Sequence, residues 1–190
     1  MSLILYIFGT LFTLLTTYFY WTLESYTKQS LQHKNVIITG GSSGIGLCTA
    51  KQLLQQYQCN IVIIGRDLNK LQSAVNELQH CNKYNTSTIK YIQSDIGDYI
   101  SINNAIQQSI EHFKSAIDIL ICCAGQTYPH MFIDIPVKYI DSQVQCNVLG
   151  TMYTVKAALP SLKQSGSKKS PSRILIVSSL GGICGVAGCM

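Results

Sequence analysis

Charged residues are scarce in this chain of 190 residues, where Asp, Glu, Lys and Arg together make up 12% of the sequence. The formal net charge is +5 at pH 7, and the Lys and Arg residues are scattered along the chain instead of being clustered. A chain that is 47% hydrophobic and so weakly charged has enough apolar surface to fold, which excludes intrinsic disorder. The scattered cations offer no basic face to a phosphate backbone, so we expect no nucleic-acid partner.

Metal-binding and disulfide patterns are missing as well. The sequence has eight Cys and four His, but no Cys-x-x-Cys pair and no Cys/His spacing that is typical of a metal site. Several cysteines fall inside predicted strands and helices, which does not fit a disulfide framework. We therefore expect no bound metal, and we interpret the cysteines as reduced thiols on the cytosolic side of a membrane.

The first 23 residues carry no charged side chain, and the apolar run over residues 3–23 is long enough to cross a bilayer as a helix. Neither a basic leader nor a small-residue cleavage site is visible, so the pattern favours an uncleaved transmembrane anchor over residues 1–24. A linker follows over residues 25–34. Its Lys28 and Lys34 lie after the anchor, which predicts that the next domain faces the cytosol.

Residues 35–190 alternate short apolar runs with stretches in which apolar side chains recur at helical spacing. The short runs are rich in Val and Ile throughout, which is typical of parallel strands that are buried on both faces. Right-handed crossovers would then lay helices on both faces of the sheet. The sequence therefore predicts one α/β domain, a Rossmann-like doubly wound parallel sheet. The predicted strands are 35–39, 61–64, 88–92, 117–122 and 174–177, and the predicted helices are 47–57, 68–78, 102–113 and 137–162.

A glycine-rich turn follows the first predicted strand, where residues 39–46 read TGGSSGIG. Because Gly has no Cβ, such a turn can bring backbone N–H groups and the start of a helix against a phosphate. A purely structural turn is the alternative, but the position between a first strand and a helix favours dinucleotide binding. The residues predicted to bind the cofactor here are Gly40, Ser42, Ser43, Gly44, Ile45 and Gly46.

The end of the second predicted strand carries cations, whereas an acidic residue commonly stands there in dinucleotide-binding folds. Arg66 and Lys70 are four residues apart, and together they would bind a 2′-phosphate. Asp67 lies beside them and either leaves room for NAD or caps the following helix. Two solvated charges at a helix start are the alternative interpretation. The pattern favours NADP(H) over NAD(H) as the cofactor.

The glycine turn resembles that of the short-chain dehydrogenases/reductases, whose opening pattern TGxxxGxG is matched by Thr39, Gly40, Gly44 and Gly46. The resemblance runs from Asn35 to the last residue.

Further cofactor positions are implied by this resemblance. It places Asp95 at the adenine, and it places Ala124 and Gly125, which end the block CCAG, beside the cofactor. On the catalytic side it implies Asn147 in a proton relay, and either Ser178 or Ser179 as the hydroxyl that polarises a substrate carbonyl.

The reaction implied by the resemblance is hydride transfer between a nicotinamide and a ketone, with a Tyr as proton donor and a Lys four residues after it. No Tyr-x-x-x-Lys follows Ser179, and the family's pair would fall beyond Met190. Tyr153 and Lys156 are only three residues apart, inside the preceding helical pattern. We therefore expect a domain that is incomplete at its C-terminus and a 190-residue polypeptide that is inactive. A short form that binds NADP(H) without catalysis is the alternative.

Within the family, the chain resembles most the 3-ketodihydrosphingosine reductases, membrane-anchored and NADPH-dependent enzymes of sphingolipid synthesis at the endoplasmic reticulum. The shared marks are the apolar N-terminal segment, the string TGGSSGIG, the CAG block, and Gly182, Gly185 and Gly188. The resemblance implies a lipid ketone as substrate and the membrane as partner. Hydroxysteroid dehydrogenases, which share an ALPxLKQ segment with residues 158–164, are the alternative, and a homo-oligomer is compatible with the sequence.

Overall fold

The computed structural model describes residues 13–22, 31–82, 87–168, 170–179 and 181, and the chain divides into two units, Met1–Gln32 and His33–Met190. In the first unit, residues 13–22 are helical, and Thr17 and Thr22 donate their hydroxyls to carbonyl oxygens one turn earlier. Among the described residues, no helix combines the length and the apolar character that a bilayer crossing requires. The rest of the expected anchor, residues 1–12 and 23–24, lies outside the described residues.

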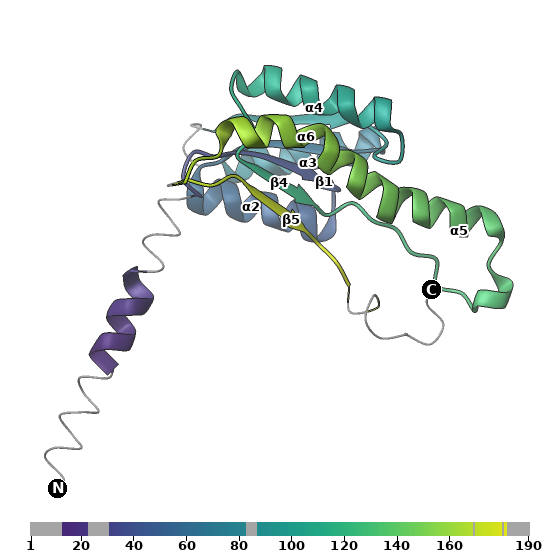
Figure 1. The fold of residues 1–190 in the computed structure, drawn as a ribbon, viewed down its shortest axis with the longest axis horizontal. Helices are drawn as coiled ribbons and strands as arrows, with labels where there is room; N and C mark the ends of the chain where they lie inside the picture. The colour runs from purple at the N-terminus through teal and green to yellow at the C-terminus, as the bar shows by residue number, and fades with distance from the viewer. Residues whose placement is uncertain (1–12, 23–30, 83–86, 169, 180, 182–190) are drawn as a thin grey trace, which may run out of the picture. The chain divides into compact units, whose positions relative to one another are not determined.

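The second unit is built on a sheet of five parallel strands, in the order β3-β2-β1-β4-β5. Each strand lies within two residues of its predicted position, and the Val and Ile runs of β1 and β2 are buried as strands covered on both faces should be. The strand order reverses between β1 and β4, and this is the doubly wound arrangement that the sequence predicts (Figure 1). The strands are β1 (Asn35–Thr39), β2 (Asn60–Gly65), β3 (Ile89–Gln93), β4 (Ile119–Cys122) and β5 (Arg173–Ile176).

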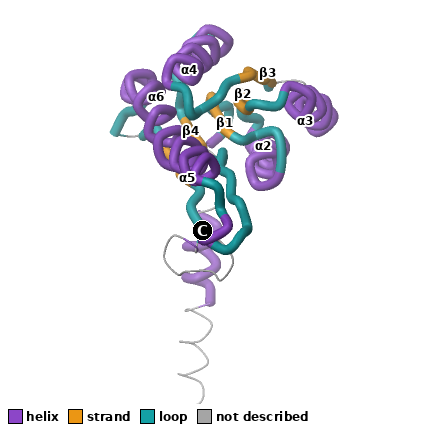
Figure 2. Tube along the Cα trace, turned by 90° about the vertical axis from the view of Figure 1, so that its right-hand side faces the viewer, coloured by secondary structure: helices purple, strands orange, loops and turns teal. Residues whose placement is uncertain are grey.

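Helices cover both faces of this sheet, with α2 and α3 on one face and α4 and α6 on the other (Figure 2). The core on the second face joins Ile106 of α4 and Leu162 of α6 to Ile37 and Leu120 of the central strands. The helices are α2 (Gly44–Tyr57), α3 (Leu68–Cys81), α4 (Tyr99–Phe113), α5 (Val137–Gln143) and α6 (Thr151–Ser165).

One long helix is predicted over residues 137–162, and the structure places a π-helix (Val144–Gly150) between α5 and α6. A π-helix has a wider turn than an α-helix, so it shifts the direction of the side chains that follow. Gly150 at its end packs so closely on Ile96 that an added Cβ would lie 2.7 Å from the Ile96 side chain. The predicted helical stretch is confirmed, and the π-helix within it is a feature that the sequence pattern does not indicate.

The sheet is unevenly covered. All five residues of β1 are buried, whereas the apolar side chains of the edge strand β5 are exposed, Leu175 by 53% and Ile176 by 52%. The polar segment over residues 163–172 begins inside α6, which ends at Ser165. Gly182, Gly185 and Gly188 lie outside the described residues.

Candidate active site

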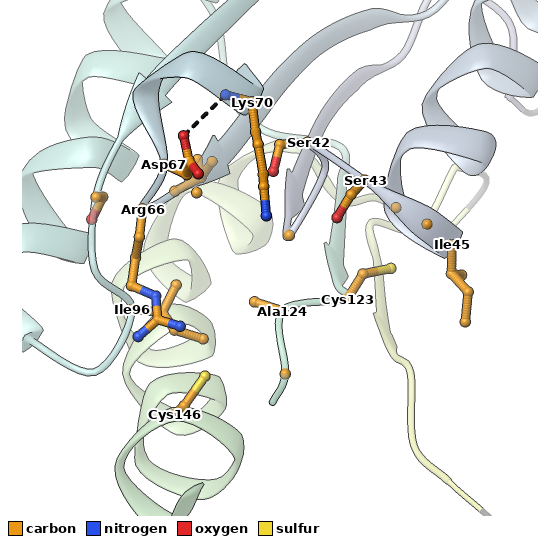
Figure 3. A pocket seen from close by; sticks show the side chains of 17 residues that line it. Ser42, Ser43, Ile45, Arg66, Asp67, Lys70, Ile96, Cys123, Ala124 and Cys146 are labelled. Carbon is orange, nitrogen blue, oxygen red and sulfur yellow. Dashed lines mark hydrogen bonds between the residues drawn. The ribbon is translucent and has the colours of Figure 1, made fainter. Parts of the chain in front are cut away.

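A pocket of about 390 Å³ opens at the carboxyl ends of β1, β2 and β4, where the strand order reverses. In open parallel sheets, ligands bind at this edge. The turn between β1 and α2 forms one wall of the pocket, and the start of α3 and the residues after β4 form others (Figure 3). The six residues of the glycine turn that are predicted to bind the cofactor all line this pocket, and so do Arg66, Lys70, Ala124 and Gly125.

Backbone geometry explains why glycine is required in this turn. Gly40 has φ +68°, and an added Cβ would lie 2.7 Å from the backbone N of Ala124. At Gly46 an added Cβ would lie 2.4 Å from the carbonyl oxygen of Gly40. The turn is therefore packed against the residues after β4 at a distance that only glycine permits.

The start of α2 differs from the starts of the two helices that follow it. Asp67 caps α3 by accepting from the backbone N of Lys70, and Asp98 caps α4 by accepting from the backbone N of Ile100 and Ser101. Ser43, at the same position of α2, makes no capping hydrogen bond through its side chain, and the first turn of α2 has no acidic residue. The N–H groups and the positive end of the α2 dipole are therefore left for an anion in the pocket.

Two cationic side chains extend into the pocket, Arg66 from the end of β2 in the direction of Cys146 and Lys70 from the first turn of α3 beside the glycine turn (Figure 3). Neither of them forms an ion pair with a carboxylate of the described residues. Asp67 does line the pocket, but its carboxylate accepts from the backbone N of Lys70 at 3.1 Å, which is the capping role that the sequence left open. The net charge at this end of the pocket is positive.

Asn147 of the π-helix anchors the chain that follows β4. Its side-chain oxygen accepts from the backbone N of Gln126 at 2.9 Å, and its side-chain nitrogen donates to the carbonyl oxygen of Gln126 at 2.8 Å. The amide of Asn147 is thus used to hold the backbone next to Gly125, and Asn147 itself does not line the pocket. Its role in a proton relay stays a prediction.

Three other predicted residues also lie outside the pocket lining. Asp95 is exposed and accepts from the backbone N of Gly97 at 2.9 Å, while its neighbours Ser94 and Ile96 line the pocket. Ser178 and Ser179 are exposed just beyond β5, where the backbone N of Val177 still donates to the carbonyl oxygen of Cys122. Both serines therefore lie at the same edge of the sheet as the pocket, and their catalytic role stays a prediction.

The pocket is also lined by residues that are not among those predicted from the sequence, and these include Ile96 and Cys146. Burial raises the pKa of the Cys146 thiol, and it also raises the pKa of Cys123, which lines the pocket beside Ala124. Both thiols are therefore neutral at physiological pH and act as small apolar walls. Among the described residues, no group of three His, Cys, Asp or Glu side chains could hold a metal.

A doubly wound sheet with a glycine turn and an uncapped helix start at its switch point defines a dinucleotide-binding α/β protein. The sequence profile of the short chain dehydrogenase family matches residues 34–190. The chain therefore belongs to the short-chain dehydrogenase/reductase family, a family of oxidoreductases.

Curated relatives include a 3-ketodihydrosphingosine reductase of Dictyostelium discoideum, which is 31% identical over 86% of this chain and 52% of its own length. A 3-dehydrosphinganine reductase of Danio rerio is 30% identical over 83% of this chain and 46% of its own length. The chain spans about half the length of these relatives. The chain is thus similar to these reductases.

Solved structures agree with the fold. A short-chain type dehydrogenase/reductase from Mycobacterium ulcerans superposes with a TM-score of 0.71 at 26% identity, over 79% of this chain and 52% of that one. A putative short-chain dehydrogenase/reductase from Burkholderia xenovorans gives a TM-score of 0.72 at 26% identity, over 82% of this chain and 63% of that one.

Proposed function

We propose that this chain forms the cofactor-binding part of an NADPH-dependent reductase that acts on a long-chain lipid ketone, namely 3-ketodihydrosphingosine. The main support is the pocket itself, in which an uncapped helix start and two cations that are not ion-paired to described carboxylates surround one cavity. A tightly packed glycine turn, the positive end of a helix and two further cations together favour the binding of a dinucleotide that carries a 2′-phosphate.

The residues of the pocket divide the binding of such a cofactor between them. The N–H groups of the glycine turn and of the first turn of α2 would receive the pyrophosphate. Arg66 and Lys70 would bind the 2′-phosphate, and Ala124 and Gly125 would lie along the nucleotide. When bound, the cofactor supplies a hydride to the ketone carbon. Ser178 or Ser179 would then polarise the ketone oxygen, which must gain a proton as the hydride arrives.

The substrate proposal rests on the relatives, two of which are named for 3-ketodihydrosphingosine and 3-dehydrosphinganine reduction. The apolar N-terminal run also supports the substrate proposal, because attachment to a membrane brings an enzyme that reduces a lipid ketone close to its substrate. We therefore propose an anchored protein of the endoplasmic reticulum whose folded domain faces the cytosol.

The cofactor proposal is tested by measuring the affinities of NADPH and NADH for the purified 190-residue chain in detergent. We expect NADPH to bind more tightly, and we expect the double substitution of Arg66 and Lys70 by Ala to remove about 1.5–3 kcal/mol of NADPH binding for each lost charged contact. NADH binding should change little. Equal losses for both cofactors would contradict the assignment of these two side chains to the 2′-phosphate.

Turnover is tested separately with NADPH and 3-ketodihydrosphingosine, and with a 3-ketosteroid as the competing substrate. We expect the 190-residue polypeptide to bind NADPH and to reduce neither ketone, because no Tyr-x-x-x-Lys follows Ser179. Loss of a general acid lowers a rate by about 100- to 10,000-fold. Extension of the polypeptide by sequence that carries this pair should restore reduction of the sphingoid ketone, and a preference for the steroid would contradict the substrate proposal.

A further inference from the structure

Arg66 is held at both of its ends. Its backbone oxygen accepts from the side chain of Gln93 at 2.9 Å, and its Nη2 donates to Oε1 of Gln126 at 3.0 Å. Gln126 lies 60 positions further along the chain, on the opposite side of the strand-order reversal. A flexible arginine at the pocket is thereby fixed by a residue that does not itself line the pocket.

Gln126 is well placed to fix it, because Gln126 is itself held by several contacts. Its backbone is bound on both sides by Asn147, and its Nε2 donates to the carbonyl oxygen of Ser142 at 2.7 Å and to the Ser142 hydroxyl at 2.5 Å. An amide nitrogen can only donate and an amide oxygen can only accept. Once Nε2 is bound to Ser142, Oε1 must face the guanidinium.

We propose that Gln126 is a positioning residue that sets the preference of this pocket for a 2′-phosphorylated nucleotide by holding the Arg66 guanidinium in place. The inference rests on the proposed use of NADP(H). An arginine has five N–H donors, and the contact with Gln126 occupies one nitrogen, so the remaining donors can form a fork for a phosphate. Fixing the side chain before binding also removes part of the entropy that binding would otherwise cost.

The neutrality of the amide matters as much as its position. A carboxylate at position 126 would form an ion pair with Arg66, but it would lack the donor that binds the Ser142 carbonyl and would cancel the positive charge that attracts the phosphate. A glutamine therefore holds Arg66 without reducing its charge. This predicts that Gln126→Glu, a change of one functional group, lowers the affinity for 2′-phosphorylated nucleotides.

A purely structural role for the Gln126 side chain predicts something different. The loop after β4 is held through the backbone of Gln126 by Asn147, and those two hydrogen bonds do not involve the Gln126 side chain. Substitution of the side chain should therefore leave the loop in place. If the side chain contributed only to the stability of the fold, its loss would weaken the binding of every nucleotide to the same extent.

The experiment compares adenosine 2′,5′-bisphosphate with adenosine 5′-monophosphate, two probes that differ only in the 2′-phosphate. Their affinities are measured by calorimetry on the 190-residue chain in detergent and on its Gln126→Glu and Gln126→Met variants. We expect Gln126→Glu to lower the affinity for the bisphosphate at least about tenfold and Gln126→Met to lower it about threefold. The affinity for the monophosphate should stay within about twofold of its original value. Ser142→Ala is the matched control, because it removes one acceptor and leaves the carbonyl that orients the amide.

The possible outcomes separate this inference from the proposed function. If the unmodified chain prefers the bisphosphate and both variants keep that preference in full, the role of Gln126 is refuted while the cofactor assignment stands. An equal loss of affinity for both probes also refutes the role of Gln126, since a general structural role gives that result. A chain that binds the two probes equally well refutes the NADP(H) assignment and the role of Gln126 together. Thermal unfolding of Gln126→Met identifies a variant that fails to fold, in which case Gln126→Glu decides.

Discussion

At the scale of single residues, the glycines of the β1–α2 turn are required for different reasons. An added Cβ at Gly46 would meet the rigid carbonyl of Gly40, whereas an added Cβ at Gly44 would meet nothing within 4 Å. Gly44 nevertheless has φ +50° and lines the pocket. Gly46 therefore serves packing, and Gly44 keeps the approach to the turn open for a ligand.

This difference predicts opposite patterns for two alanine variants. Gly46→Ala should lower the free energy of unfolding by about 3 kcal/mol or more, because backbone must move to make room. Gly44→Ala should lower the free energy of unfolding by about 1–2 kcal/mol, because residue 44 has a left-handed backbone conformation. It should also weaken the binding of NADPH at least about tenfold, because the added methyl group fills the space at the phosphate. Urea denaturation and calorimetry measure the two effects. A Gly44→Ala protein with unchanged NADPH affinity would show that no phosphate approaches this turn.

Cys122 gives a second prediction at this scale, because burial raises the pKa of its thiol from about 9 to about 12. Below pH 9 the thiol is protonated in both the folded and the unfolded chain. Between the two pKa values only the unfolded chain loses the proton, so stability must fall as pH rises, by about 1.4 kcal/mol per pH unit for this thiol.

The free energy of unfolding is measured for the natural chain and for Cys122→Ala at about pH 8, 9.5 and 10.5. These values lie on both sides of the ordinary pKa of a thiol, which is about 8.5. The variant has lost the thiol and should lose less stability over this interval, although a cavity makes it less stable at pH 8. Lys and Tyr titrate alike in both proteins, so the difference between the two slopes isolates Cys122. Parallel slopes would contradict the prediction.

At the scale of elements, the sequence predicts the strands and the glycine turn well because their signals are local. A run of Val and Ile marks a buried strand, and the TGGSSGIG string marks the turn whatever surrounds it. The π-helix is not predictable in this way, because its apolar side chains recur much as they do in an α-helix. The contact of Gln126 with Arg66 is also beyond local patterns, since it depends on partners 60 and 16 positions away.

The π-helix positions Asn147 to hold the loop after β4, and this contact can be tested directly. Asn147→Ala removes both hydrogen bonds to the Gln126 backbone, so we expect a loss of about 1–3 kcal/mol in the free energy of unfolding. The amide hydrogen of Gln126 should be slow to exchange in the natural chain and fast in the variant. Val148→Ala, an exposed neighbour on the same π-helix, is the control and should leave that amide protected.

At the scale of the whole molecule, the sheet is well covered at its central strands β1 and β2 and poorly covered at its edge strand β5. Ile174, Leu175 and Ile176 are exposed in a strand that pairs only with β4 among the described strands. An open edge with apolar side chains is a template for pairing with another chain. The 190-residue polypeptide should therefore associate with itself through β5.

Sedimentation velocity over a range of protein concentrations, in detergent, tests this expectation. The natural chain should shift to larger species as its concentration rises, and Leu175→Lys should weaken the association at least about tenfold, because a charge on an edge strand opposes edge-to-edge pairing. The matched control is Ile100→Lys, since Ile100 is 71% exposed at the start of α4 and lies on a different element. Association that survives Leu175→Lys but disappears in Ile100→Lys would place the contact on the helical face and would leave the edge of β5 without a role in it.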